Sequence, residues 1–161
     1  MKKVIHRAGT RGHSDHGWLD SYHTFSFADY HDPERIHFGA LRVLNDDTVA
    51  GGEGFGAHPH DNMEIVSIPL EGELRHQDSM GHTSVLRTGE IQVMTAGTGI
   101  IHSEFNNSPN RPVKFLQIWI FPDRHGLPTR YEEITLAPAR TNELRTLVAP
   151  EGNGSEHTAW I

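Results

Sequence analysis

Apolar and polar residues alternate along this chain in short runs that end at turn signals. Residues 38–46 (FGALRVLND) alternate and end at Asn-Asp, and residues 64–72 are rich in β-branched residues and end at Glu-Gly. Residues 113–121 (VKFLQIWIF) form the longest apolar run. Strands of this length, with a turn about every 8–12 residues, are typical of an antiparallel sandwich or barrel. The pattern therefore predicts an all-β fold.

Helices have little support in the sequence. No stretch between residues 38 and 121 keeps an apolar period of about 3.6 residues. We expect at most a few short helices, around residues 131–133 or 140–147. Pro69 lies inside a strand-like run but cannot donate a hydrogen bond to a neighbouring strand, so we expect it at a sheet edge or a bulge.

Composition restricts the class of protein. The length of 161 residues suits one domain, and the absence of cysteine excludes disulfides, thiolate ligands and a cysteine nucleophile. The net charge is −7 and there is no basic block, so we expect no direct nucleic-acid binding. The N-terminal lysines precede no apolar stretch, and the longest apolar run is too short to span a bilayer. We therefore expect a soluble cytoplasmic protein with no membrane partner.

Two pairs of potential metal ligands repeat one spacing. His58 and His60 lie two residues apart, and so do His102 and Glu104. Alternate residues of a strand face the same side, so each pair should project together. If two strands bring the pairs to one barrel mouth, three imidazoles and one carboxylate converge, a set that suits a divalent transition metal ion. Each motif taken alone also fits a solvated or hydrogen-bonded pair.

These motifs resemble those of the cupin superfamily, in which five residues separate a glycine from H-x-H and a later histidine is followed four positions on by an asparagine. Gly52 and Asn106 occupy these places. The segments GWLDSYHTFSFADY, HPHDNMEI, LEGELRHQDSMG and TAGTGIIHSEFN are most similar to the pirin family. The resemblance covers about residues 10–135. It implies a cupin-type double-stranded β-helix, that is, a jelly-roll β-barrel with the metal inside.

One departure from the general cupin pattern concerns its glutamate. Six residues should separate that glutamate from Gly72, but Ile65 holds this place and Glu64 comes one residue earlier. A step of one residue turns a strand side chain to the other face, so we expect Glu64 to point away from the histidine pair unless a bulge at Met63 turns it inward. The pirin resemblance implies four metal ligands: His58, His60, His102 and Glu104.

Other candidate residues receive weaker support. We expect a surface or hydrogen-bonding role for His76 rather than a place in the barrel lining, and a tight turn at Gly97 and Gly99. Three residues are candidates for contacts to the ligands, although no spacing supports them: Arg42, Asn45 and Asp46. Four aromatic residues are expected in the core rather than in a pocket: Trp18, Phe25, Phe27 and Trp119.

The resemblance also implies an activity, that of a quercetin 2,3-dioxygenase, which cleaves a flavonol ring with O2 and releases CO. It implies one divalent transition metal ion per barrel, with iron expected and zinc, copper, nickel, manganese or cobalt as alternatives. Glu104 would be the catalytic base, and the substrate a flavonol or another chelating enol or phenol. The alternative is a metal-binding regulatory protein that acts as a transcriptional cofactor through protein–protein contacts. A sugar isomerase or epimerase fits the fold but not the pirin-like motifs.

The domain organisation follows from the same resemblance. Residues 1–135 are expected to form the N-terminal cupin barrel, and residues 136–161 a C-terminal extension that resembles the start of a second barrel. Pirin-like proteins usually carry two barrels that pack together. We therefore predict that the chain is a fragment or that its C-terminal segment (residues 145–161) mediates self-association.

Overall fold

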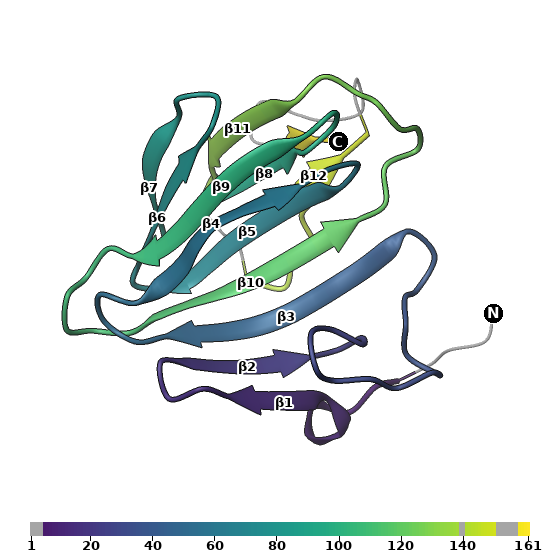
Figure 1. Cartoon of the computed structure of the whole chain (residues 1–161), viewed down its shortest axis with the longest axis vertical. Coiled ribbons are helices and arrows are strands. Elements are labelled where there is room, and N and C mark those ends of the chain that lie inside the picture. The colour runs from purple at the N-terminus through teal and green to yellow at the C-terminus, as the bar shows by residue number, and fades with distance from the viewer. Residues whose placement is uncertain (1–4, 139–140, 151–157) are drawn as a thin grey trace.

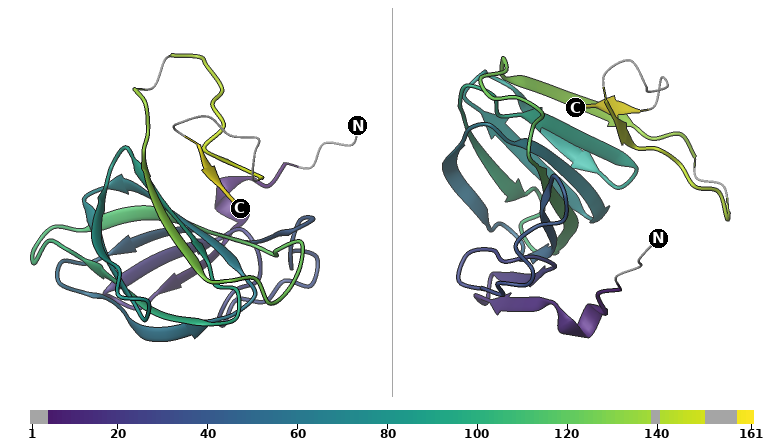
Figure 2. Two further views of the ribbon diagram at one scale, coloured as in Figure 1. Left: turned by 90° about the horizontal axis from the view of Figure 1, so that it is seen from above. Right: turned by 90° about the vertical axis from the view of Figure 1, so that its right-hand side faces the viewer.

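The computed structural model describes residues 5–138, 141–150 and 158–161. Their regular secondary structure is almost entirely β, and two antiparallel sheets form the walls of a barrel (Figures 1 and 2). The larger sheet has the strand order β1 (Gly12–Asp15), β2 (Leu19–His23), β3 (Leu41–Val49), β10 (Val113–Ile120), β5 (Glu64–Glu71), β8 (Glu90–Thr95) and β11 (Arg130–Thr135). The smaller sheet has the order β4 (Gly54–His60), β9 (Ile100–Asn106), β6 (Glu73–Asp78) and β7 (Thr83–Arg87).

The inward faces of three strands explain where the site lies. Burial alternates along β3, β6 and β9, as the sequence predicted, but at least two of the buried residues in each strand are polar. A purely structural barrel would fill these positions with apolar side chains, since a buried polar group costs free energy unless it is paired. The buried polar positions are Asn45 and Asp47 on β3, His76 and Asp78 on β6, and His102, Glu104 and Asn106 on β9.

Apolar residues close the barrel around this polar centre. One cluster, which includes Val49, Leu74 and Phe115, lies on one side of the site, and a second, which includes Ile65 and Met94, lies on another. β8 is buried along nearly its whole length because both of its faces are covered. Its inner face packs in the barrel, and its outer face carries Ile91 and Val93, which contact the C-terminal residues.

The expected helix at residues 131–133 is wrong, because these residues lie in β11. β8 offers an open edge, and β11 pairs with it in register from Arg130 opposite Thr95 to Thr135 opposite Glu90. This pairing satisfies backbone groups that a helix would leave free at the sheet edge. Residues 141–147 form turns and irregular structure, and residue 140 lies outside the described part. The one helix in the described residues is a 3₁₀ turn at Ala8–Thr10, and none is long or apolar enough to cross a membrane.

Pro69 lies where the sequence places it. It stands opposite Phe115 on β10, and the register shifts between Lys114 and Phe115, which marks a bulge. On the other side of β5, β8 pairs with residues 64–67, so Pro69 has no partner strand there among the described residues. Its missing N–H therefore removes no ladder bond to β8.

The described part of the C-terminal segment lies on the outer face of the larger sheet. β12 (Val148–Ala149) pairs in parallel with β13 (Ala159–Trp160). Leu147 and Ile161 pack beside Val66, Ile91 and Val93. Residues 151–157 lie outside the described part of the chain. Self-association through this segment, and the reading of residues 136–161 as the start of a second barrel, stay predictions.

Candidate metal centre

The three predicted histidines converge where β4 meets β9. These strands pair antiparallel with His58 directly opposite His102, and the i, i+2 step places His60 on the same face as His58. The ring centroid of His58 lies 4.4 Å from that of His102 and 4.9 Å from that of His60. One ring nitrogen from each residue lies within 4.8 Å of the others. This spacing allows all three to contact a single ion.

Glu104 lies deep in the same site. Its carboxylate accepts hydrogen bonds from Ser67 Oγ at 2.9 Å and from Gln117 Nε2 at 2.8 Å, one on each oxygen. A carboxylate oxygen of Glu104 lies within 4.8 Å of ring nitrogens of His76 and His102, which form a second group of potential ligands. His102 belongs to both groups, so it links Glu104 to the other two histidines.

Burial keeps the histidines in the form that binds metal. It lowers the pKa of His102 to about 2 and that of His60 to about 4, and the neighbouring histidines add to both effects. These rings are therefore neutral at neutral pH, as a ligand must be. Both ring nitrogens of His102 are buried without a hydrogen-bond partner among the described residues. A buried polar atom of this kind needs a partner, and a metal ion would provide one.

His58 is oriented by a backbone contact. Its Nδ1 donates to the carbonyl oxygen of Gly56 at 2.7 Å. This contact holds the proton on Nδ1 and leaves the lone pair on Nε2 free, an arrangement common for metal-binding histidines. Burial raises the pKa of the Glu104 carboxyl to about 7, and the hydrogen bonds from Ser67 and Gln117 act against this rise.

His76 lies beside the centre, although we expected it outside the barrel lining. It is fully buried, stands opposite Glu104 in the β6–β9 ladder, and its ring centroid is 5.4 Å from that of His102. Its Nε2 lies 3.2 Å from Asp78 Oδ2, so the expected hydrogen-bonding role is confirmed and the surface role is wrong. The only local signal was the H-x-D spacing that Asp78 adds.

Glu64 lies apart from the histidines, as its register predicted. Its carboxylate accepts a hydrogen bond from Thr95 Oγ1 at 2.7 Å, and it belongs to neither group of potential ligands in the described residues.

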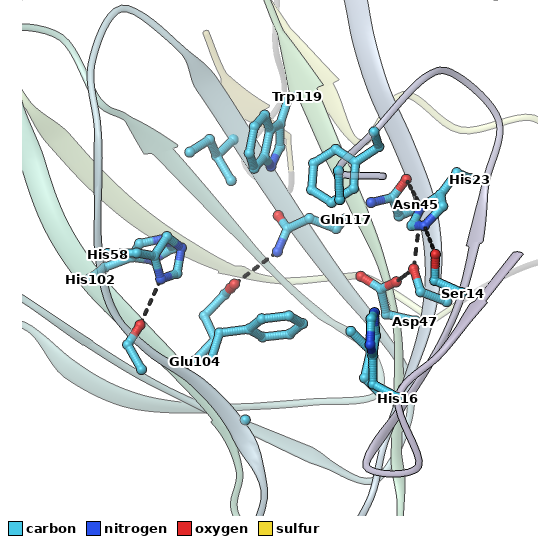
Figure 3. A pocket seen from close by; sticks show the side chains of 18 of the residues that line it. Ser14, His16, His23, Asn45, Asp47, His58, His102, Glu104, Gln117 and Trp119 are labelled. Atoms are coloured by element: carbon cyan, nitrogen blue, oxygen red, sulfur yellow. Dashed lines mark hydrogen bonds between the residues drawn. The ribbon is translucent and has the colours of Figure 1, made fainter. Parts of the chain in front are cut away.

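A pocket of about 450 Å³ opens beside the cluster and is lined by all four predicted ligands. Its size is typical of small-molecule sites. Trp18, Phe27 and Trp119 line it, so the expectation that they lie outside a pocket is wrong, although Trp18 and Trp119 also pack against the core clusters. Phe25 is buried as expected. The alternation of β10 places Trp119 on the same face as Gln117, toward the site (Figure 3). The ring of Trp119 lies 4.8 Å from that of His60.

The three remaining candidates for contacts to the ligands lie in different places: Arg42, Asn45 and Asp46. Asn45 lines the pocket. Arg42 instead donates to the backbone carbonyls of Ser26 and Ile36, and Asp46 pairs with basic side chains away from the pocket. Asn45 is the only one of the three to reach the site because it shares the inward face of β3 with Asp47.

Known proteins resemble the chain over most of its length. The model of the Pirin family matches residues 4–120. The quercetin 2,3-dioxygenase of Escherichia coli K12 is 54% identical over 129 residues, which are 80% of this chain and 56% of that protein. The crystal structure of bacterial pirin YhhW from Escherichia coli in complex with nickel(II) matches with a TM-score of 0.89 at 45% identity, over 96% of this chain and 65% of that chain.

A crystal structure of a quercetin 2,3-dioxygenase from Acinetobacter baumannii matches with a TM-score of 0.58 at 29% identity, over 71% of this chain and 42% of that chain. The chain thus spans less than two thirds of the length of each of these relatives.

Proposed function

This chain belongs to the pirin family, and from that premise we propose that it is a metal-dependent dioxygenase of the quercetin 2,3-dioxygenase type. The observation that carries the proposal is a group of three converging histidines beside a buried carboxylate, at one end of a pocket with aromatic walls. The E. coli relative that is 54% identical carries this enzyme's name.

The proposed ligands of one divalent transition metal ion are His58, His60, His102 and Glu104. The unpartnered nitrogens of His102 and the lowered pKa values of His60 and His102 support this set. Imidazole and carboxylate together fit iron, nickel and several other divalent ions, so the donor set leaves the metal open. Iron is our expectation, and the related bacterial pirin was crystallised with nickel(II).

When bound, such an ion supplies Lewis-acid and redox chemistry toward a chelating enol or phenol and O2. The residues of this chain provide the rest. Glu104 has a pKa near neutrality, so its carboxylate is able to take the hydroxyl proton of a chelating substrate. Ser67 and Gln117 hold this carboxylate in one orientation. The walls formed by Trp18, Phe55 and Trp119 suit a flat aromatic ligand and exclude water from it.

Metal analysis and oxygen uptake test the proposal. Wild-type protein should hold about one metal ion per barrel and consume O2 with release of CO when quercetin is added. The double variant His58→Ala/His102→Ala should lose both properties. His37→Ala is the matched control, because His37 is exposed and does not line the pocket.

Undiminished stoichiometric metal in the double variant would overturn the ligand set. Metal binding without oxygen uptake on quercetin would overturn the dioxygenase and favour the regulatory alternative.

A further inference from the structure

The pocket has a second polar wall, which the proposed chemistry does not use. Figure 3 shows it across the pocket from His58, His102 and Glu104. β2 and β3 build it: Ser21 stands opposite Asp47 and His23 opposite Asn45 in the β2–β3 ladder. The i, i+2 step on each strand turns all four side chains into the pocket, and each residue is at most 4% exposed.

Most polar atoms of this wall satisfy one another. Ser21 Oγ donates to Asp47 Oδ1. The His23 ring lies with Nδ1 3.0 Å from Asn45 Oδ1 and with Nε2 3.2 Å from Ser14 Oγ. The ring therefore bridges two strands and holds the wall in place.

Asp47 is the exception. Within the described residues, its second carboxylate oxygen has no hydrogen-bond donor and no basic side chain pairs with it. The nearby cations Arg11 and Lys114 contact Asp46 instead, which the strand alternation turns to the opposite face. The second oxygen of Asp47 is not among the sealed, unpartnered atoms, so it remains open to the pocket.

A buried carboxyl group without a cation destabilises the fold, and burial accordingly raises the pKa of Asp47 to about 7. A ligand with a hydroxyl group would satisfy the open oxygen. Between this wall and the histidines lie the hydrogen-bonded pair Glu104 and Gln117 (Figure 3) and aromatic side chains, with Trp18 packed edge-to-face on Phe55 and Phe27 on Trp119. The pocket thus offers a polar group at each end and aromatic walls between the two ends.

We propose that Asp47 is a specificity-determining contact, whose open oxygen accepts a hydrogen bond from a substrate hydroxyl at the end opposite the chelating group. This inference rests on the proposed function and defines its substrate class: flat aromatic molecules with a chelating enol or phenol at one end and a neutral hydroxyl at the other. A sulfate or carboxylate at the far end is rejected, because it would meet a carboxylate without a countercharge.

Anaerobic binding to metal-loaded protein tests this contact, because it requires no turnover. The probes are quercetin, which carries hydroxyls on both outer rings, and 3-hydroxyflavone, which keeps the chelating group but lacks them. Asp47→Asn retains an oxygen for Ser21 but places an NH2 group where a hydroxyl must donate. We expect this variant to bind quercetin about tenfold more weakly than wild type, equivalent to about 1.4 kcal/mol. Its affinity for 3-hydroxyflavone should change less than twofold. Asp46→Asn is the matched control and should change neither affinity.

A second arm uses only wild-type protein, so it does not depend on the folding of a variant. Methyl ethers of quercetin at the outer-ring hydroxyls cannot donate, and at least one should bind about tenfold more weakly than quercetin. Equal effects of Asp47→Asn on both probes, or equal affinity for quercetin and all its ethers, would overturn the inference.

The two proposals fail separately. If quercetin binds as expected but is not oxidised in air, the dioxygenase proposal is overturned and the proposed Asp47 contact stands. If wild type and Asp47→Asn oxidise quercetin with equal efficiency, the proposed Asp47 contact is overturned and the dioxygenase proposal stands. If neither flavonol binds the metal-loaded wild-type protein, both are overturned.

Discussion

Replacing Gln117 by Met should weaken metal binding in a pH-dependent way. Gln117 Nε2 donates to Glu104 Oε2 at 2.8 Å, and both residues are buried. Methionine has nearly the same volume but no donor, so the barrel should keep its packing. The carboxylate would retain only the bond from Ser67.

The size of the effect follows from the lost bond. A hydrogen bond to a charged group contributes about 1.5–3 kcal/mol, and about 1.4 kcal/mol corresponds to one pH unit. Its loss should move the pKa of Glu104 from about 7 to about 8–9 in the metal-free protein. At pH 7 the ionised fraction falls from about one half to about 1–10%, so the metal Kd should rise about 5- to 50-fold. Above the new pKa the proton no longer competes, and the difference from wild type should shrink.

Competition with a chromophoric chelator, at pH 7 and at pH 9.5, measures this Kd. Gln92→Met is the matched control: Gln92 is a buried glutamine on β8 whose Nε2 has no hydrogen-bond partner among the described residues. Its loss removes no donor from Glu104 and should leave the metal Kd within about twofold of wild type. A Gln117→Met protein that binds metal as tightly as wild type at pH 7 would refute the reasoning, and so would a loss of equal size at both pH values.

Four variants and one hydrodynamic measurement provide further tests. Glu104→Gln should lower quercetin turnover about 100-fold but reduce metal content far less, because the amide offers an oxygen but accepts no proton; unchanged turnover, read by oxygen electrode, would leave Glu104 as a ligand only. Asp47→Asn should stabilise the metal-free protein by about 2–4 kcal/mol at pH 8 and by almost nothing at pH 4. The folded pKa of Asp47 (about 7) exceeds its ordinary value of 3.8, so the wild type loses stability as pH rises between them; urea melts at both pH values check the sign. Gly54→Ala should cost at least about 2 kcal/mol, because its Cβ would lie 2.4 Å from the backbone oxygen of Glu104, whereas Gly56→Ala meets no atom within 4 Å and should be tolerated in thermal melts. The predicted self-association through the C-terminal segment should appear in light scattering as a mass above 18.1 kDa, and a monomer at high concentration would contradict it.

Local patterns in the sequence were enough to predict the strands and the core of the candidate site. The two-residue period identifies strands because it is a property of one segment, and the same period pairs His58 with His60 and His102 with Glu104. The missing donor of Pro69 likewise predicts a bulge or an edge without knowledge of the neighbouring strands. The register of Glu64 excluded it from the histidine cluster for the same local reason.

The second half of the pocket depended on contacts between distant segments. Asp47 and Trp119 read as ordinary strand residues, and only the pairing of β3 with both β2 and β10 brings their faces into one cavity. The expected helix at residues 131–133 failed for a related reason, since the open edge of β8 overrides local preference. The two-residue period of a strand shows which residues share a face. It does not show whether that face meets apolar side chains, another polar wall or an open pocket. That choice is made by strand order and register across long sequence separations, so the tertiary structure alone decides it.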